Sequence, residues 1–149
     1  MSIHSHRTQT AGFTLVELMI TVVIASVLLA IAIPSYRSSV LKSRRTDARN
    51  AVLDLAAREQ RYYSLQNTFT NLPLNLGYST DPRATFPMNV GSNYYSVDIT
   101  TTASTFNVTA TAINSQTADS QCQKFTVTDT GSRTALDSGG ADDTSTCWP

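Results

Sequence analysis

The chain has 149 residues, with eleven Lys/Arg, eleven Asp/Glu and a formal net charge of zero. This length suits one folded domain and excludes two full-sized ones. The zero net charge hides a division. Seven Lys/Arg and three acids lie between Arg37 and Arg61, whereas three Lys/Arg and seven Asp lie between Thr80 and Pro149. The chain therefore has a basic middle and an acidic end.

Residues 1–12 are polar and contain no apolar region of the kind found in a secretory signal peptide. An apolar stretch of 21 residues follows from Phe13 to Ile33, and Glu17 is its one charged residue. At about 1.5 Å per residue, a helix of this length spans roughly 30 Å, the thickness of the hydrocarbon core of a bilayer. A carboxylate inside such a helix costs about 2.5 to 3.5 kcal/mol on insertion scales, so we expect a compensating partner.

An amphipathic helix is predicted from Tyr36 to about Leu65, where the sequence contains no Gly or Pro. Pro34 removes one amide donor and crowds the carbonyl of Ala30, so we expect an interruption between the apolar stretch and this helix. Apolar and aromatic residues recur at offsets of three, four and seven, which predicts one stripe packed on the C-terminal domain. The stripe comprises Leu41, Ala48, Val52, Leu55, Ala56, Tyr62 and Tyr63.

Turn-forming residues are concentrated in residues 66–92, which indicates a long irregular connection and a candidate contact surface. Beyond it, apolar and polar residues alternate in 95–99, 106–112 and 125–128, the pattern of half-buried strands. A turn at 128–132 leads to a predicted fourth short strand near 133–136. We therefore expect an α+β fold, with an antiparallel sheet of about four strands in 93–136 and one apolar face against the helix.

Cys122 and Cys147 are the only cysteines. An isolated pair beyond a membrane segment is typical of a disulfide in an oxidising compartment, and a two-cysteine metal site would need further ligands. We predict that this disulfide closes the region 122–147 and fastens the polar tail back onto the sheet.

Catalytic chemistry has little support from the residue types present. The two histidines, His4 and His6, precede the apolar stretch, and the carboxylates are scattered without an acid/base pair. The adjacent Asp142 and Asp143 supply too few oxygens for calcium, so a solvated turn is favoured there. We expect no enzyme activity, no cofactor and no metal site.

Several motifs resemble those of a known family. The run Gly12-Phe13-Thr14-Leu15-Val16-Glu17 resembles the prepilin peptidase site of type IV pilins, and Ala30 to Tyr36 resembles the end of their membrane segment. Further resemblance, to minor pilins of the PilE type, runs through residues 58–64, 112–117 and 147–148. The resemblance covers nearly the whole chain. It implies the type IV pilin fold, a long N-terminal helix whose apolar half protrudes and whose second half packs on a small antiparallel sheet.

The resemblance also implies the processing and the location of the chain. A leader of residues 1–12 would be removed after Gly12 by prepilin peptidase, which would also methylate the new amino group of Phe13. Residues 13–35 would form the transmembrane and assembly helix, and residues 36–149 a periplasmic head domain. The implied location is the bacterial inner membrane, crossed once, and then the extracellular pilus.

The implied partners are other major and minor pilins, the inner-membrane assembly machinery, and membrane lipid before assembly. Glu17 would attract the amino group of Phe13 on a neighbouring subunit. A buried carboxylate is tolerated when it is paired with a cation, because low dielectric strengthens their attraction. The alternative is a membrane helix with a tolerated glutamate.

The charges that flank the apolar stretch conflict with this topology. Five Lys/Arg follow it within residues 37–49 and only Arg7 precedes it, so a positive-inside count would place the C-terminal part in the cytoplasm. The cysteine pair and the cleavage motif both require the opposite orientation, and we give them more weight.

Ser26 departs from the pattern of many filament pilins, which have glycine at this position. In those proteins the stretch between the glycine and the proline can lose helical order on assembly. A serine can donate a hydrogen bond to the carbonyl one turn earlier and weakens the helix only slightly. Whether the helix melts between Ser26 and Pro34 is therefore left open.

Four residues, Lys42, Arg44, Arg45 and Arg49, form a candidate basic contact face. They could bind DNA phosphates, lipid headgroups or the acidic domain of an adjacent subunit. We favour subunit contacts, because the helix lies near the axis of a filament, where DNA cannot easily reach it.

The resulting functional hypothesis is a structural minor pilin that supports pilus assembly and, through it, twitching motility, adhesion or DNA uptake. A DNA-binding competence pilin and a pseudopilin of a type II secretion system are the alternatives.

Overall fold

The computed structural model describes residues 12–148. The expected leader therefore lies outside the described residues, apart from Gly12. The chain divides into two units, residues 1–37 and 38–149, and we describe each by itself. Helix α1 (Leu15–Gln66) supplies residues to both units.

Helix α1 continues through Pro34. The predicted helix break at Pro34 is therefore wrong as an interruption of secondary structure. Proline removes a single amide donor from the ladder, and the residues on either side keep their helical conformation. No glycine occurs between Gly12 and Gly77, so no other residue of the helix strongly favours a break.

The second unit contains the head domain, whose core begins on one face of α1. Val52, Leu55 and Ala48 are fully buried, as the predicted stripe requires. Arg45 and Glu59 also lie on this buried face, which the apolar pattern did not predict. The helix ends at Gln66, and Asn67 follows it with a positive φ of 53°, the left-handed conformation that commonly terminates helices.

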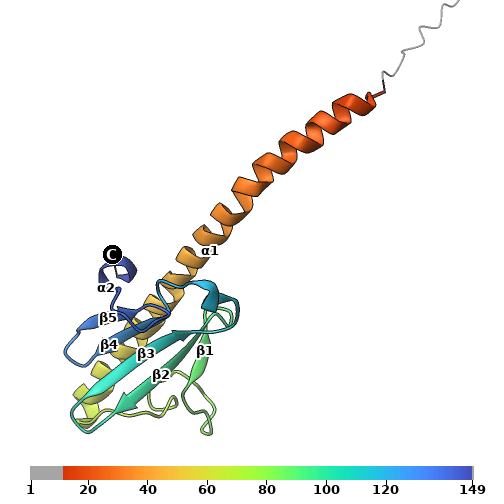
Figure 1. Cartoon of the computed structure of the whole chain (residues 1–149). Helices are drawn as coiled ribbons and strands as arrows, with labels where there is room; N and C mark the ends of the chain where they lie inside the picture. Colours follow the sequence, from red (N-terminus) through yellow and green to blue (C-terminus); the bar gives the residue numbers. More distant parts are fainter. Residues whose placement is uncertain (1–11, 149) are drawn as a thin grey trace, which may run out of the picture. The chain divides into compact units, whose positions relative to one another are not determined.

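The sheet has five antiparallel strands in the order β1-β2-β3-β4-β5. Every connection therefore joins neighbouring strands, and Figure 1 shows the sheet lying beside the second half of α1. The strands are β1 (Met88–Val90), β2 (Tyr95–Thr101), β3 (Phe106–Ala112), β4 (Lys124–Thr128) and β5 (Arg133–Leu136).

Strand β1 was not predicted, because it lies inside the stretch assigned to the irregular connection. It has three residues and follows Pro87, so its sequence is too short to show alternation. It pairs with β2 through Met88 opposite Val97 and Val90 opposite Tyr95. The other four strands match the predicted ones, and the correction is therefore one additional edge strand.

One face of the sheet and the stripe of α1 form a single hydrophobic core. The inward residues alternate along the strands as predicted, because successive side chains of a strand point to opposite faces. Tyr95, Phe125 and Val108 are fully buried there, and the rings of Tyr95 and Phe125 meet edge to face with centroids 6.0 Å apart.

The tail after β5 is fastened by the predicted disulfide between Cys122 and Cys147, whose Cα atoms are 5.8 Å apart. Cys147 ends the one-turn helix α2 (Thr144–Cys147), and a 3-10 helix, η1 (Asn114–Ala118), connects β3 with the other cysteine's segment. Trp148 donates its indole N–H to the carbonyl of Thr134 at 3.0 Å. The disulfide prediction is confirmed.

Replacing both Cys122 and Cys147 by serine is expected to lower the free energy of unfolding by about 3 to 4 kcal/mol, because the bridge closes a long loop. Denaturant unfolding of the full-length chain in detergent micelles, followed by circular dichroism, measures this difference. The reduced wild type serves as a control for the serine substitutions themselves. A loss below about 0.5 kcal/mol would show that Trp148 and the tail hydrogen bonds hold the segment without the bridge.

Candidate functional site

The predicted cleavage site lies immediately before α1. Gly12 and Phe13 are not helical, and the Phe13 side chain is 80% exposed. Thr14 precedes the first helical residue, and its Oγ1 accepts the backbone N–H of Glu17 at 3.2 Å. This is an N-cap, and Thr14 and Glu17 have the spacing of a capping box. Thr14 therefore caps the helix, and Glu17 lies in its first turn. The sequence reading had not predicted this cap.

The apolar stretch is exposed along its length within its own chain. An 18-residue window in α1 has a mean hydropathy of 2.7 and no buried residue, so the helix is long and apolar enough to cross a membrane. That conclusion rests on length and composition only. Large exposed apolar surfaces mark contacts with lipid or with other proteins.

Ser26 behaves as predicted. Its hydroxyl donates to the carbonyl of Val22, one turn earlier, at 2.7 Å, and the helix remains continuous around it. Thr21 forms a similar bond to the carbonyl of Leu18 at 2.8 Å. Both hydroxyls are therefore satisfied by the helix itself.

The four residues of the candidate basic contact face do not form one exposed surface. At about 100° per residue, Lys42, Arg45 and Arg49 share a side of α1, whereas Arg44 is turned by roughly 200° from Lys42. The guanidinium carbon of Arg44 lies 3.5 Å from the centre of the Tyr94 ring, and its Nη1 donates to Ser115 Oγ at 3.2 Å. Arg44 is thus engaged with its own head domain.

Arg45 requires the larger correction, because its side chain is buried. It forms a bidentate pair with Asp119, with Nε–Oδ2 and Nη2–Oδ1 distances of 2.7 Å each. The side chains of Arg45 and Asp119 are 9% and 4% exposed. Arg45 therefore belongs to the interior, and the exposed basic residues of this side are reduced to Lys42 and the half-buried Arg49.

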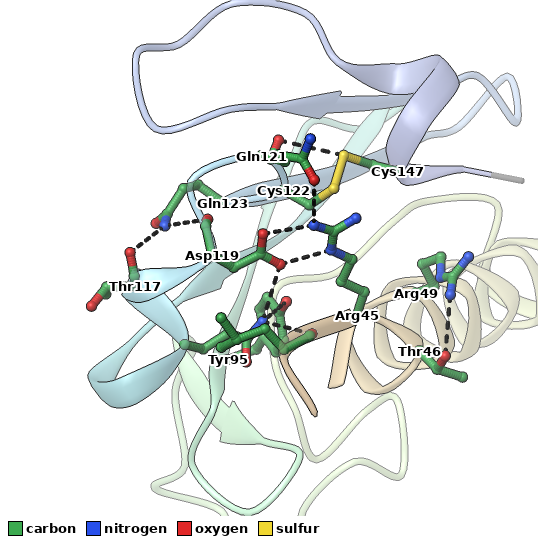
Figure 2. A network of polar contacts seen from close by, with 12 residues as sticks. Arg45, Thr46, Arg49, Tyr95, Thr117, Asp119, Gln121, Cys122, Gln123 and Cys147 are labelled. Carbon is green, nitrogen blue, oxygen red and sulfur yellow. Dashed lines mark hydrogen bonds and ion pairs between the residues drawn. A yellow bond between two sulfur atoms is a disulfide. The ribbon is translucent and has the colours of Figure 1, made fainter. Parts of the chain in front are cut away.

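A network of polar side chains surrounds this ion pair (Figure 2). Arg45 Nη2 also donates to Gln121 Oε1 at 3.2 Å. The Gln116 amide donates to the carbonyl of Leu41 at 3.1 Å and to the Tyr95 hydroxyl at 3.0 Å. The network thus ties α1 to β2, η1 and the segment before the disulfide. It satisfies groups that would otherwise be unfavourable in the interior.

The surroundings of this network raise the pKa values of Arg45 and Tyr95. The hydrogen bond that Arg45 donates to Asp119 raises the pKa of Arg45, although burial opposes it. Burial, followed by the charge of Asp119, raises the pKa of Tyr95 to about 12. Tyr95 therefore remains a neutral hydroxyl at neutral pH.

Removing one partner of this pair is expected to destabilise the head strongly. Asp119→Ala leaves a buried guanidinium without its counter-ion, which lowers the free energy of unfolding by about 3 to 5 kcal/mol. The double replacement Arg45→Met with Asp119→Leu should be milder than the single change, because no buried charge remains.

Denaturant unfolding of the full-length variants in micelles measures both effects. The matched control is Asp54→Ala, which removes the exposed Arg58–Asp54 pair and should change stability by less than about 1 kcal/mol. A comparably small loss for Asp119→Ala would contradict the role assigned to the pair.

Glu59 is the residue that the sequence reading missed. Its side chain is fully buried. Oε2 accepts the backbone N–H of Thr70 at 3.2 Å, and Oε1 has no hydrogen-bond partner among the described residues. Burial raises its pKa from 4.5 to about 7, against the opposing effect of the Thr70 N–H. The signal was its spacing, because Glu59 follows Leu55 by four residues and Val52 by seven and so falls on the apolar stripe.

The fold and the N-terminal segment define a class of protein. A long helix with an exposed apolar N-terminal half, followed by an antiparallel sheet and a disulfide-closed tail, is the construction of a type IV pilin. Residues 7–33 also match the family model described as "Prokaryotic N-terminal methylation motif". The chain is a type IV pilin, and the resemblance predicted from its motifs is confirmed.

The family within this class follows from a second match. Residues 34–126, more than half of the chain, match the family model described as "Type IV minor pilin ComP, DNA uptake sequence receptor". The chain belongs to this family. It is therefore a type IV pilin of the minor-pilin kind.

Individual curated relatives match shorter parts of the chain than the family model does. The chain is 30% identical to the "Type IV major pilin protein PilA" of Myxococcus xanthus over 70 residues, which are 47% of this chain and 32% of that protein. It is 42% identical to the "Fimbrial protein EcpC" of Eikenella corrodens over 53 residues, 36% of this chain and 35% of that protein. The chain thus spans about a third of the length of these curated relatives.

A solved type IV pilin from Shewanella oneidensis is similar in structure. It is 23% identical, with a TM-score of 0.44, and the match covers 62% of this chain and 89% of that one.

Proposed function

We propose that this pilus subunit is made as a prepilin that is cut between Gly12 and Phe13 and methylated on the Phe13 amine. The match of residues 7–33 to the N-terminal methylation motif supports this processing. The cut bond precedes the Thr14 cap, so the enzyme would meet an extended, exposed segment rather than a helix. Prepilin peptidase and the inner-membrane assembly machinery are the partners that this route requires.

The head domain faces the periplasm in this proposal. A disulfide forms and persists in an oxidising compartment, and the Cys122–Cys147 bridge would otherwise stand in a reducing cytosol. Residues 13–35 cross the inner membrane before assembly, and the head, residues 36–149, moves to the cell exterior with the pilus.

Glu17 directs assembly by attracting the Phe13 amine of a neighbouring subunit. Two of its features support this role. Its side chain is exposed in the isolated chain, and the described residues supply no cation near it. In a bundle of apolar helices, a lone carboxylate would be unfavourable, and an ammonium group from a neighbour offsets that unfavourable burial.

Glu17→Ala is expected to reduce incorporation of the subunit into sheared pili at least tenfold, because an attraction of about 1.4 kcal/mol or more is lost. Membrane levels of the variant should stay close to wild type, since alanine inserts at least as easily as glutamate. Immunoblots of the pilus and membrane fractions measure the two quantities. Ser26→Ala is the control, and equal incorporation of the Glu17 variant would refute the pairing.

We further propose that the chain binds DNA, as the description of its family states for ComP. The match of residues 34–126 carries this proposal. It also changes the ranking of the hypotheses, because the DNA-binding pilin had been the alternative. The DNA contact should lie outside the candidate basic contact face, because Arg44 packs on the Tyr94 ring and Arg45 is paired with Asp119.

The proposed DNA contacts are exposed cations that belong to elements other than α1. They are Arg83 in the segment before β1, Lys124 on β4 and Arg133 on β5. Phosphate contacts of this kind supply affinity and strong salt dependence.

Exchanging Arg83, Lys124 and Arg133 for glutamine together should weaken duplex binding and lower the slope of log K against log salt by about 0.9 for each lost contact. Fluorescence anisotropy of the full-length chain in a zwitterionic detergent, over a salt series, measures both. Lys42→Gln with Arg49→Gln is the matched control and should leave the slope unchanged. The reverse result would return the contact to α1, and no binding by the wild type would refute the DNA proposal while leaving pilus assembly untouched.

A further inference from the structure

The segment that follows α1 is held down in two separate places. Its first part is held by the Thr70 N–H on Glu59 and by the ring of Phe69, which stacks on Tyr63 with centroids 4.5 Å apart. Phe69 also meets the edge of Phe106 at 4.9 Å. The second part is held by Arg58, whose Nη1 donates to the carbonyls of Leu76 and Gly77 at 3.1 and 3.0 Å.

The two attachments differ in how they respond to pH. Arg58 stays charged, and Asp54 accepts from its Nε at 2.8 Å. Glu59 can exist as an acid or as an anion, and burial with one hydrogen bond from the Thr70 N–H favours the neutral acid. Residues 64–77 contain no ionisable side chain, so the segment offers Glu59 no counter-ion.

The surrounding elements do not neutralise Glu59 either. Burial and the Thr70 N–H are the influences on the pKa of the Glu59 carboxyl, and the neighbouring Gln60 donates to the carbonyl of Asp129 at 2.9 Å. The head also lacks a histidine, since both histidines of the chain precede residue 7. The charged or titratable residues nearest to Glu59 along α1 are Asp54, Arg58, Arg61, Tyr62 and Tyr63. From other elements, Tyr78 lies near Arg58, and Asp129 and Arg133 of the sheet line a pocket with Gln60, the next residue of the helix.

We propose that Glu59 and Thr70 form a pH-sensitive latch on residues 67–72. The latch is closed while Glu59 is a neutral acid. Ionisation places an uncompensated negative charge in the interior, and opening of the segment relieves it by admitting water to the carboxylate. When the protonated, closed form opens between these two states, the proton of Glu59 passes to solvent.

The direction of the effect follows from the two states of Glu59. Below its ordinary pKa of 4.5, the carboxyl is protonated in both the closed and the open segment, so pH has no effect. Between 4.5 and about 7 the open segment holds fewer protons, so rising pH favours opening. Above about 7 both forms are ionised and the effect levels off.

The latch has a consequence for the surface of the head. Leu72 and Leu74 are 49% and 45% exposed, and Leu65 at the end of α1 is 73% exposed. Exposed leucines suit contacts with other proteins. Opening of residues 67–72 would move Leu72, so the exposure of this side chain would depend on pH.

Hydrogen exchange of the full-length chain in micelles tests the proposal. For a latch whose carboxyl has a pKa of about 7 closed and 4.5 open, the protection factors of residues 70–72 should fall roughly thirtyfold between about pH 5.5 and pH 8. Glu59→Gln keeps an acceptor for the Thr70 N–H and cannot ionise, so its protection factors should stay constant. Asp98→Asn removes an exposed carboxylate of β2 and should retain the wild-type response.

A second measurement keeps the test valid if Glu59→Gln does not fold. The carboxyl carbon of Glu59, labelled with ¹³C in the wild-type chain, should titrate near pH 7 by NMR. A midpoint near 4.5, or protection factors of residues 70–72 that do not change with pH, would overturn the latch. The same fall in protection in Glu59→Gln as in the wild type would also overturn it.

Discussion

The head domain depends on burying one face of a long helix under a single sheet. Most of that face is apolar, as in Val52 and Leu55, and such burial contributes about 25 cal/mol per Å² of apolar surface. Two charged residues interrupt it. Arg45 is fully paired with Asp119, whereas Glu59 has one backbone donor. The Arg45–Asp119 pair fixes the position of the segment before the disulfide. Glu59 is the buried residue whose ionisation is proposed to loosen the domain.

Much of the architecture could be predicted from the sequence. Alternation with period two located three of the five strands, and the turn at 128–132 indicated a fourth. Helical spacing located the buried stripe, because it reports which side chains face the core. Strand β1 could not be found in this way, since three residues after a proline show no period. The break expected at Pro34 was wrong because a single missing donor does not outweigh the continuing hydrogen bonds around it.

The predictions of the candidate sites succeeded where they depended on local sequence and failed where they depended on distant residues. The disulfide and the back-bond of Ser26 followed from residue type and local geometry, and the structure has both. The basic contact face failed because charge was counted along the sequence, while burial depends on partners far away. Asp119 lies 74 residues after Arg45, and no local pattern links them. The same limitation hid Glu59, whose spacing placed it on the buried stripe but whose charge suggested a surface position.

The hydrogen bonds inside the apolar half of α1 bear on how this segment changes environment. The hydroxyls of Thr14, Thr21 and Ser26 all bond to the backbone of their own helix. They need no outside donor or acceptor, so moving the helix from lipid into a protein bundle neither breaks nor creates a bond for them. The Glu17 carboxylate is different, because the described residues give it no such bond. In the proposed route from membrane to pilus, Glu17 would be the side chain whose partners change most, because apolar side chains pack similarly against lipid tails and neighbouring helices.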